Sequence, residues 1–212
     1  MTKRLLIIGA GGHGKVAADC AELSNDFDEI AFLDSGFPNV KQVLSWSVVG
    51  DGKDIAAFVS AGTYFFVAVG DNQARARLIT QVLAASGKLA TLIHPSSVIS
   101  SQVKIGDGTL VCANATINIS ATIGRGSIIN TAASVDHDCV IEDYVHLAPG
   151  TRLAGNIKVG EGTFVGIGST IIPGIELGKH CLLGAGSTLL SDLASNSVAV
   201  GCPAKVIKQY FL

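Results

Sequence analysis

The sequence has few charged residues, few aromatic residues and no closely spaced pair of cysteines. Charged residues occupy 15% of the 212 positions and the formal net charge is −2, so there is no electrostatic reason to expect nucleic acid or an anionic membrane as a partner. The five cysteines are odd in number and include no Cys-x-x-Cys pair, so neither a disulfide framework nor a metal site is expected. No apolar run approaches the ~20 residues that span a bilayer. These absences predict a soluble, cytoplasmic protein.

A strict period of six runs from residue 99 to residue 189. An aliphatic residue occupies every sixth position, sixteen times without a miss, from Ile99 and Ile105 to Leu183 and Leu189. Neither a helix nor a simple strand has this period, but short strands joined by equal turns around a repeating cross-section do. The stretch resembles the hexapeptide-repeat left-handed β-helix of acyltransferases, in which three hexads make one triangular coil. On that analogy the sixteen hexads form about five coils.

Glycine or asparagine often follows the aliphatic residue directly, as at Gly106, Asn118 and Gly124. Both residue types tolerate a positive φ. We therefore expect the left-handed backbone conformation at this position of the repeat.

The N-terminal segment has the pattern of strand, glycine turn and helix. An apolar run over residues 4–8 leads into Gly9-Ala10-Gly11-Gly12-His13-Gly14, a segment of helical composition follows over 15–21, and a second strand over 29–33 ends at Asp34. In a Rossmann-like unit the glycines let the backbone approach a phosphate, and the acid binds a ribose hydroxyl. The pattern favours nucleotide binding. A tight turn without a ligand is the alternative, and His13 either reaches the ligand or faces solvent.

Residues 1–92 are thus expected to form a small parallel α/β unit. A helix over 51–60, a buried strand over 64–69 and an amphipathic helix over 72–86 complete it. A unit of half the usual size suits one nucleotide better than a dinucleotide. Residues 93–212 form the β-helix domain, whose tail leaves the repeat and ends with the apolar Tyr210-Phe211-Leu212, a candidate cap for the open last coil.

One turn of the repeat has the residues of an acid–base site, because His137 lies between Asp136 and Asp138. A carboxylate beside a histidine fixes its tautomer and stabilises the imidazolium that forms when it removes a proton. Spacing leaves both acids open as the partner of the ring, and Asp138 is favoured. A hydrated turn without chemistry is the alternative.

If a coil has about eighteen residues, Gly155 stacks beside His137 one coil further along. A glycine there leaves an open backbone N–H, which is suited to a thioester carbonyl and its oxyanion. His146 lies half a coil from His137, so the two meet only across a subunit interface. The alternatives are an ordinary turn glycine and a histidine packed between subunits.

Four segments together resemble one family. They are the glycine loop, the junction Ile93-His94-Pro95, the site Ser134-Val135-Asp136-His137-Asp138-Cys139, and the tail Gly201-Cys202-Pro203-Ala204-Lys205. They look like the bacterial sugar acetyltransferases, which include the bacillosamine and perosamine N-acetyltransferases and a sialic-acid O-acetyltransferase. The resemblance implies a homotrimer with acetyl-CoA in the cleft between neighbouring β-helices and no metal. It also implies that the N-terminal domain holds a UDP- or GDP-linked amino sugar.

The same resemblance implies roles for individual residues. His137 removes a proton from the sugar amine, with Asp138 as its partner, and Gly155 contacts the acetyl oxygen. Other implied contacts are Ile167 and Ala185 with the pantetheine arm, Asn130 and Asp136 with the acceptor, and Gly11, Gly12, His13 and Asp34 with the nucleotide. His146, which its spacing places across the interface, is expected to be a supporting contact for acetyl-CoA. The sequence departs from its relatives at Asp34-Ser35-Gly36, where they often have a further acid or a lysine. The nucleotide is therefore left open.

Two other functions fit the sequence. An O-acetyltransferase acting on a free sugar such as sialic acid needs the same histidine and acid. A non-catalytic nucleotide-sugar-binding scaffold needs only the α/β unit, but the cluster at Asp136, His137 and Asp138 argues against it. The N-acetyltransferase is the preferred hypothesis.

Overall fold

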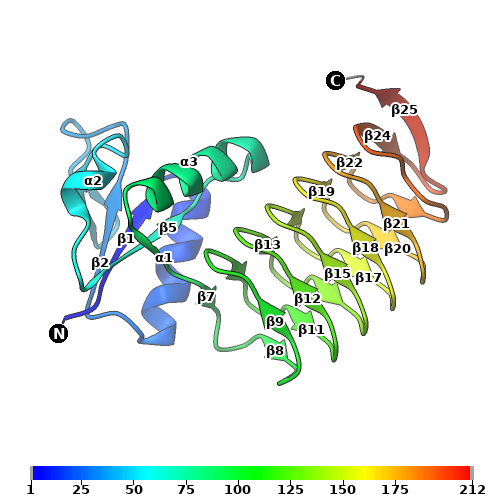
Figure 1. The fold of residues 1–212 in the computed structure, drawn as a ribbon, viewed down its shortest axis with the longest axis horizontal. Coiled ribbons are helices and arrows are strands. Elements are labelled where there is room, and N and C mark those ends of the chain that lie inside the picture. Colours follow the sequence, from blue (N-terminus) through cyan, green and yellow to red (C-terminus); the bar gives the residue numbers. More distant parts are fainter. Residues whose placement is uncertain (1, 211–212) are drawn as a thin grey trace. The chain divides into compact units, whose positions relative to one another are not determined.

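The computed structural model describes residues 2–210 and divides the chain into two compact units, Met1–Pro95 and Ser96–Leu212 (Figure 1). The sequence placed the boundary three residues earlier, after residue 92. The fold class predicted from the sequence is the one observed, an α/β unit followed by a three-sided parallel β-helix of the left-handed hexapeptide type. None of the helices within residues 2–210 is long and apolar enough to cross a membrane.

The first unit is built on a six-stranded sheet with the order β3-β4-β2-β1-β5-β6. All neighbouring strands pair in parallel except β3 with β4. The strands are β1 (Arg4–Ile8), β2 (Glu29–Leu33), β3 (Gln42–Val43), β4 (Trp46–Gly50), β5 (Thr63–Val67) and β6 (Lys88–Leu89), and β7 (Leu92–Ile93) ends the unit. The helices are α1 (Gly12–Ser24), α2 (Ile55–Phe58) and α3 (Asn72–Ala84).

The strand order determines where a ligand is expected. The chain passes from β1 to β2 in one direction across the sheet and from β5 to β6 in the other. Right-handed crossovers therefore place α1 on one face and α3 on the opposite face. Such a reversal between β1 and β5 opens a crevice beyond the carboxyl ends of these strands, which is the usual ligand site of an open α/β sheet.

Two local predictions for this unit were wrong. The helix expected over 51–60 is reduced to the single turn α2, because Asp51 accepts hydrogen bonds from the backbone of Lys53 and Asp54 and holds a turn there. Helix α1 begins at Gly12, inside the glycine loop, rather than at residue 15. The β3–β4 hairpin was not predicted.

The second unit winds around three parallel faces, each formed by two-residue strands stacked from coil to coil (Figure 1). The first face contains β10 (Leu110–Val111), β13 (Ile128–Ile129), β16 (His146–Leu147), β19 (Phe164–Val165) and β22 (Leu182–Leu183). The second contains β8 (Val98–Ile99), β11 (Thr116–Ile117), β14 (Ser134–Val135), β17 (Arg152–Leu153), β20 (Thr170–Ile171) and β23 (Thr188–Leu189). The third contains β9 (Lys104–Ile105), β12 (Thr122–Ile123), β15 (Val140–Ile141), β18 (Lys158–Val159) and β21 (Glu176–Leu177).

The aliphatic residues of the hexads fill the inside of the β-helix. Pairing joins positions eighteen residues apart, as between Val135 and Leu153, so equivalent side chains lie above one another. From Val111 to Leu189 the aliphatic residue of every hexad belongs to one buried cluster, with Ile99 and Ile105 packed against it. Burial of this continuous stack is the main force that holds the coils together.

The positive φ angles lie at a different position from the one predicted. From Ile105 to Leu183 they fall three residues after the aliphatic residue, for example at Asn114, Asp138 and Asn156, and not directly after it. The glycines that follow the aliphatic residues are needed for space instead. An ideal Cβ at Gly166 would lie 2.6 Å from the backbone nitrogen of Ala185 in the next coil.

The repeat ends after Leu189. Strand β24 (Ser197–Val200) extends the first face in parallel with β22, and β25 (Lys205–Gln209) returns antiparallel to it. Val206 and Ile207 on β25 are exposed. Phe211 and Leu212, which the sequence assigned to a cap, lie outside the described residues.

Candidate active site

His137 and Asp138 lie in the turn between β14 and β15, where the second and third faces of the β-helix meet. His137 Nδ1 is 2.8 Å from Asp138 Oδ2, and Asp138 has a left-handed φ of 59°. Because a carboxylate accepts, Nδ1 donates its proton and the neutral ring keeps a lone pair on Nε2. The hydrogen bond to Asp138 raises the pKa of His137, and the negative charges of Asp136 and Asp138 raise it further. The pair has the form of a general base.

Asp136 is bound to the backbone and not to the ring. Its Oδ1 accepts a hydrogen bond from the backbone N–H of His137 at 2.8 Å and another from Asn118 Nδ2 at 2.9 Å. The bond from Asn118 and then the bond from His137 lower the pKa of the Asp136 carboxyl. Asp136 is therefore a fixed negative charge beside the base.

Gly155 lies against the imidazole from the next coil. An ideal Cβ at this position would lie 2.5 Å from His137 Cε1 and 2.6 Å from Nε2, so no other residue fits beside the ring as it stands. Gly155 is buried, and its backbone N–H donates to no acceptor among residues 2–210. One coil earlier the equivalent N–H, that of His137, is satisfied by Asp136. Buried N–H groups are seldom left unpaired, and one beside a base is suited to an oxyanion.

Other predicted residues gather where the first and second faces meet. Asn130 Nδ2 lies 3.0 Å from His146 Nε2, and the His146 ring packs edge-on against Phe164 with centroids 5.0 Å apart. Ile167 and Ala185 stack one coil apart in the same column of turns, and Ile167 is exposed. Asn130, His146, Ile167 and Ala185 form what we call the first-corner set. His137, Asp138, Asp136 and Gly155 form the second-corner set. One chain does not bring the two sets together.

The glycine loop of the first unit is shaped by close backbone packing. Gly9 has a φ of 101°, and a Cβ on Gly14 would collide with the carbonyl oxygen of Gly9. The Asp34 carboxylate holds the loop in place with two hydrogen bonds. Its Oδ2 accepts one from the backbone N–H of Ala10 and its Oδ1 accepts one from the N–H of Gly36, both at 2.8 Å. The exposed residues Gly11 and Gly12 open helix α1, whose N-terminal N–H groups favour an anion.

A buried arginine lies behind this loop. Arg75 on α3 is 0% exposed and donates to the carbonyl oxygens of Val69 and Gly70 and to Asn72 Oδ1, which fixes the chain just beyond β5. Burial, together with the smaller effect of the positive charge of Arg75, lowers the pKa of His13 to about 4. His13 is therefore neutral at pH 7 and meets a ligand as an uncharged hydrogen-bonding group.

Two of these residues were missed from the sequence. Arg75 precedes the buried Ile79 and Val82 by four and seven residues, so its place on the apolar face of a helix could have marked it. Asn118 lies eighteen residues before Asp136, and the coil length could have paired them.

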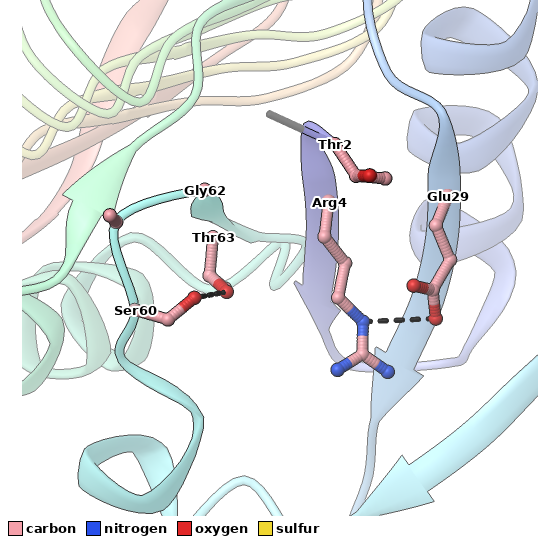
Figure 2. A pocket seen from close by; sticks show the side chains of 7 residues that line it. Thr2, Arg4, Glu29, Ser60, Gly62 and Thr63 are labelled. Atoms are coloured by element: carbon pink, nitrogen blue, oxygen red, sulfur yellow. Dashed lines mark hydrogen bonds and ion pairs between the residues drawn. The ribbon is translucent and has the colours of Figure 1, made fainter.

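A pocket of about 380 Å³ opens at the other edge of the sheet, by the amino ends of β1, β2 and β5. Figure 2 shows that its polar side chains are bound to one another, Arg4 Nε to Glu29 Oε1 at 2.9 Å and Ser60 Oγ to Thr63 Oγ1 at 2.7 Å. The glycine loop lies at the opposite, carboxyl ends of these strands, so this pocket is not at the end of the sheet where a nucleotide is expected.

The acid beside the base leads to a pH prediction. A general base acts in its neutral form, so the rate falls as the pH drops through the pKa of His137, and a raised pKa places this fall at a higher pH. Asp138→Asn keeps an oxygen for Nδ1 but removes the charge, so the acid limb of kcat/KM moves to lower pH. The weaker base lowers the plateau, by roughly tenfold.

The measurement is a pH profile of acetyl transfer for the wild type and the variant. Asp107→Asn, in an exposed turn of an earlier coil, is the control and should leave the profile unchanged. An acid limb that stays in place in Asp138→Asn contradicts the assignment of Asp138 as the partner of the base.

Comparison with known proteins gives a consistent result for both units. Residues 4–82 match the family described as the PglD N-terminal domain. Residues 102–137 match the hexapeptide repeat of succinyl-transferase, and residues 156–191 match the bacterial transferase hexapeptide. The chain is 29% identical over 179 residues to GDP-perosamine N-acetyltransferase of Escherichia coli O157:H7, which is 79% of this chain and 77% of that protein.

Solved structures are similar over almost the whole chain. One is the acetyltransferase domain of PglB from Neisseria gonorrhoeae FA1090 in complex with acetyl coenzyme A, with a TM-score of 0.94 and 34% identity over 98% of this chain and 100% of that chain. Another is a histidine-to-asparagine mutant of perosamine N-acetyltransferase from Caulobacter crescentus in complex with CoA and GDP-perosamine. Its TM-score is 0.91, with 36% identity over 97% of each chain.

Proposed function

The chain belongs to the hexapeptide-repeat acetyltransferases that have a PglD-type N-terminal domain, and we propose that it transfers an acetyl group from acetyl-CoA to the amino group of a nucleotide-linked amino sugar. The acceptor class is a UDP- or GDP-linked 4-amino sugar. The observation that supports this best is the His137–Asp138 pair facing a buried Gly155 whose N–H has no acceptor among residues 2–210. A base and an oxyanion donor within one contact of each other are what acyl transfer to an amine requires.

His137, Asp138 and Gly155 each have a separate role in the proposed acetyl transfer. Acetyl-CoA supplies the thioester whose carbonyl carbon the amine attacks. His137 Nε2 accepts the proton that the amine loses as the C–N bond forms, and Asp138 stabilises the imidazolium. The Gly155 N–H donates to the carbonyl oxygen as negative charge develops on it. The C–S bond then breaks, the imidazolium returns its proton to the departing sulfur, CoA leaves as a thiol and the amide remains on the sugar.

The first unit holds the nucleotide in this proposal. The exposed Gly11 and Gly12 at the start of α1 bind the diphosphate through backbone N–H groups, and the neutral His13 adds a hydrogen bond. Each carboxylate oxygen of Asp34 accepts one hydrogen bond from the loop backbone. Its remaining lone pairs accept a ribose hydroxyl.

We also propose that three chains form the working enzyme. The first-corner set and the second-corner set lie on different edges of one β-helix, yet both carry residues suited to the reaction. A trimer places the first corner of one chain against the second corner of its neighbour. His146, Ile167 and Ala185 then bind acetyl-CoA beside the partner's base, and Asn130 completes the acceptor side.

The test of the function is thiol release from acetyl-CoA with a panel of UDP-, GDP- and dTDP-linked 4-amino sugars and free sialic acid. Transfer to one nucleotide-linked amino sugar, with the product shown to be an amide by mass spectrometry, is the expected result. Transfer to sialic acid alone replaces the proposal with an O-acetyltransferase. Binding of nucleotide sugars without thiol release replaces it with a binding scaffold.

The trimer makes a prediction of its own. His137→Ala and His146→Ala are each expected to lower transfer, but chains of both variants mixed by co-expression can pair an intact second corner with an intact first corner. Activity of the mixture should therefore exceed that of either variant alone, by an amount set by the share of mixed trimers. Activity of the mixture that does not exceed that of either variant contradicts the shared site. So does a protein that light scattering shows to be a monomer.

A further inference from the structure

Asn118 occupies the place directly beside Asp136 in the preceding coil. Strands β11 and β14 pair in register, with Ile117 opposite Val135, and the backbone N–H of Asn118 donates to the carbonyl oxygen of Val135. The two side chains that follow these strands therefore stack. Asn118 Nδ2 lies 2.9 Å from Asp136 Oδ1.

This contact fixes how the Asp136 carboxylate is presented. Oδ1 accepts from both Asn118 and the backbone N–H of His137, so the carboxylate is held at two points. Oδ2 has no protein partner among residues 2–210. A carboxylate held this way has one free anionic oxygen with a set direction.

Among residues 2–210, Asn118 is the one side chain that donates a hydrogen bond to the Asp136 carboxylate. The charged group that acts on the Asp136 carboxylate is His137, whose ring is in turn bound to Asp138. In the column of stacked turns, Ser100 lies one coil before Asn118 and the uncharged Ala154 lies one coil after Asp136. The Asn118 amide is the side-chain donor to this carboxylate.

We propose that Asn118 is a positioning residue for the reaction, which holds Asp136 from the neighbouring coil so that its charge stays beside His137 and its free oxygen accepts a hydrogen bond from the amino group of the acceptor. The part that concerns the acceptor rests on the proposed function. The part that concerns His137 rests on the geometry alone. Asn118 does not touch the reacting atoms, and its side chain is exposed, so the fold does not depend on it.

The first test separates positioning from folding by kinetics. Asn118→Ala frees the Asp136 side chain to rotate, and the loss of one hydrogen bond raises KM for the amino sugar about fivefold while kcat changes less. KM for acetyl-CoA stays the same, because in this proposal acetyl-CoA does not contact the Asp136 carboxylate. Ser100→Ala removes a side chain from the same column one coil away and is expected to change neither constant.

The second test does not depend on knowing the substrate. The titration of the His137 Cε1–H signal is followed by NMR in the full chain, with His137→Ala used to assign the signal. In Asn118→Ala the midpoint moves to lower pH, because Asp136 no longer holds its charge beside the ring. Ser100→Ala leaves it in place.

The two tests fail in distinguishable ways. A His137 titration that is the same in Asn118→Ala and the wild type overturns the positioning role, whatever the kinetics show. A moved His137 titration with an unchanged KM for the amino sugar limits the role of Asn118 to the base and overturns the contact of Asp136 with the amino group. A wild-type protein that acetylates no amino sugar removes the proposed function, and the titration still decides the role of Asn118.

Discussion

Replacing His137 with alanine is expected to lower acetyl transfer about a thousandfold, because the amine then has no base to take its proton. The ring is 55% exposed, so its loss leaves the β-helix core intact and the thermal unfolding temperature close to that of the wild type. Thiol release from acetyl-CoA with the best amino sugar measures the rate. Calorimetric titration of the nucleotide is expected to give an unchanged affinity, since the glycine loop lies in the other unit.

His180→Ala is a matched control for this change. His180 is exposed and lies against Gly162 much as His137 lies against Gly155, with an ideal Cβ of the glycine 2.5 Å from its Nδ1. It stands in a turn between the third and first faces, away from Asp138. His180→Ala should keep full activity. Full activity in His137→Ala would remove His137 from the mechanism.

Gly155→Ala is expected to lower activity about a hundredfold, the cost of a misplacement of about 1 Å at a reacting group. The new Cβ would stand 2.5 Å from His137 Cε1, so the exposed ring must swing away from the Gly155 N–H. Because the ring has solvent to move into, the unfolding free energy changes little. The base and the oxyanion donor would then no longer face one carbonyl group.

A double-mutant cycle separates displacement of the ring from damage to the coil. If Gly155→Ala acts by pushing His137 aside, adding it to His137→Ala lowers activity much less than it lowers the wild type, because there is no ring left to move. Steady-state rates of the four proteins measure this coupling. Equal losses in both backgrounds would show that the methyl group acts on the coil itself or blocks the Gly155 N–H directly.

The period of six was enough to predict short strands joined by equal turns around a repeating cross-section, and the resemblance to hexapeptide-repeat acyltransferases supplied the three sides of each coil. The same arithmetic placed Gly155 beside His137, and the structure puts the glycine against the imidazole. The glycine loop and its acid were also visible, since a strand, a close turn and a helix leave a local pattern.

Other features left weaker signals. Asp136 and Asp138 flank the histidine equally in the sequence, and the left-handed φ of Asp138 is what turns its carboxylate onto the ring. The contact between Asn130 and His146 joins a turn to a strand one coil further along, sixteen residues away, and no simple spacing marks it. The expected helix over 51–60 shortened because the Asp51 side chain competes for the backbone donors of the first turn.

Local order and the repeating core were thus present in the amino-acid sequence, because periodicity and glycine chemistry act over a few residues and need no partner. Which side chains face one another was decided by the winding of the coil, which carries Asn118, Asp136 and Gly155 from separate turns to one corner. Hydrogen bonds and close contacts depend on distances of a few tenths of an ångström between residues far apart along the chain. The stacked backbone sets those distances, and it leaves the N–H of Gly155 open where the preceding residue has no carboxylate to satisfy it.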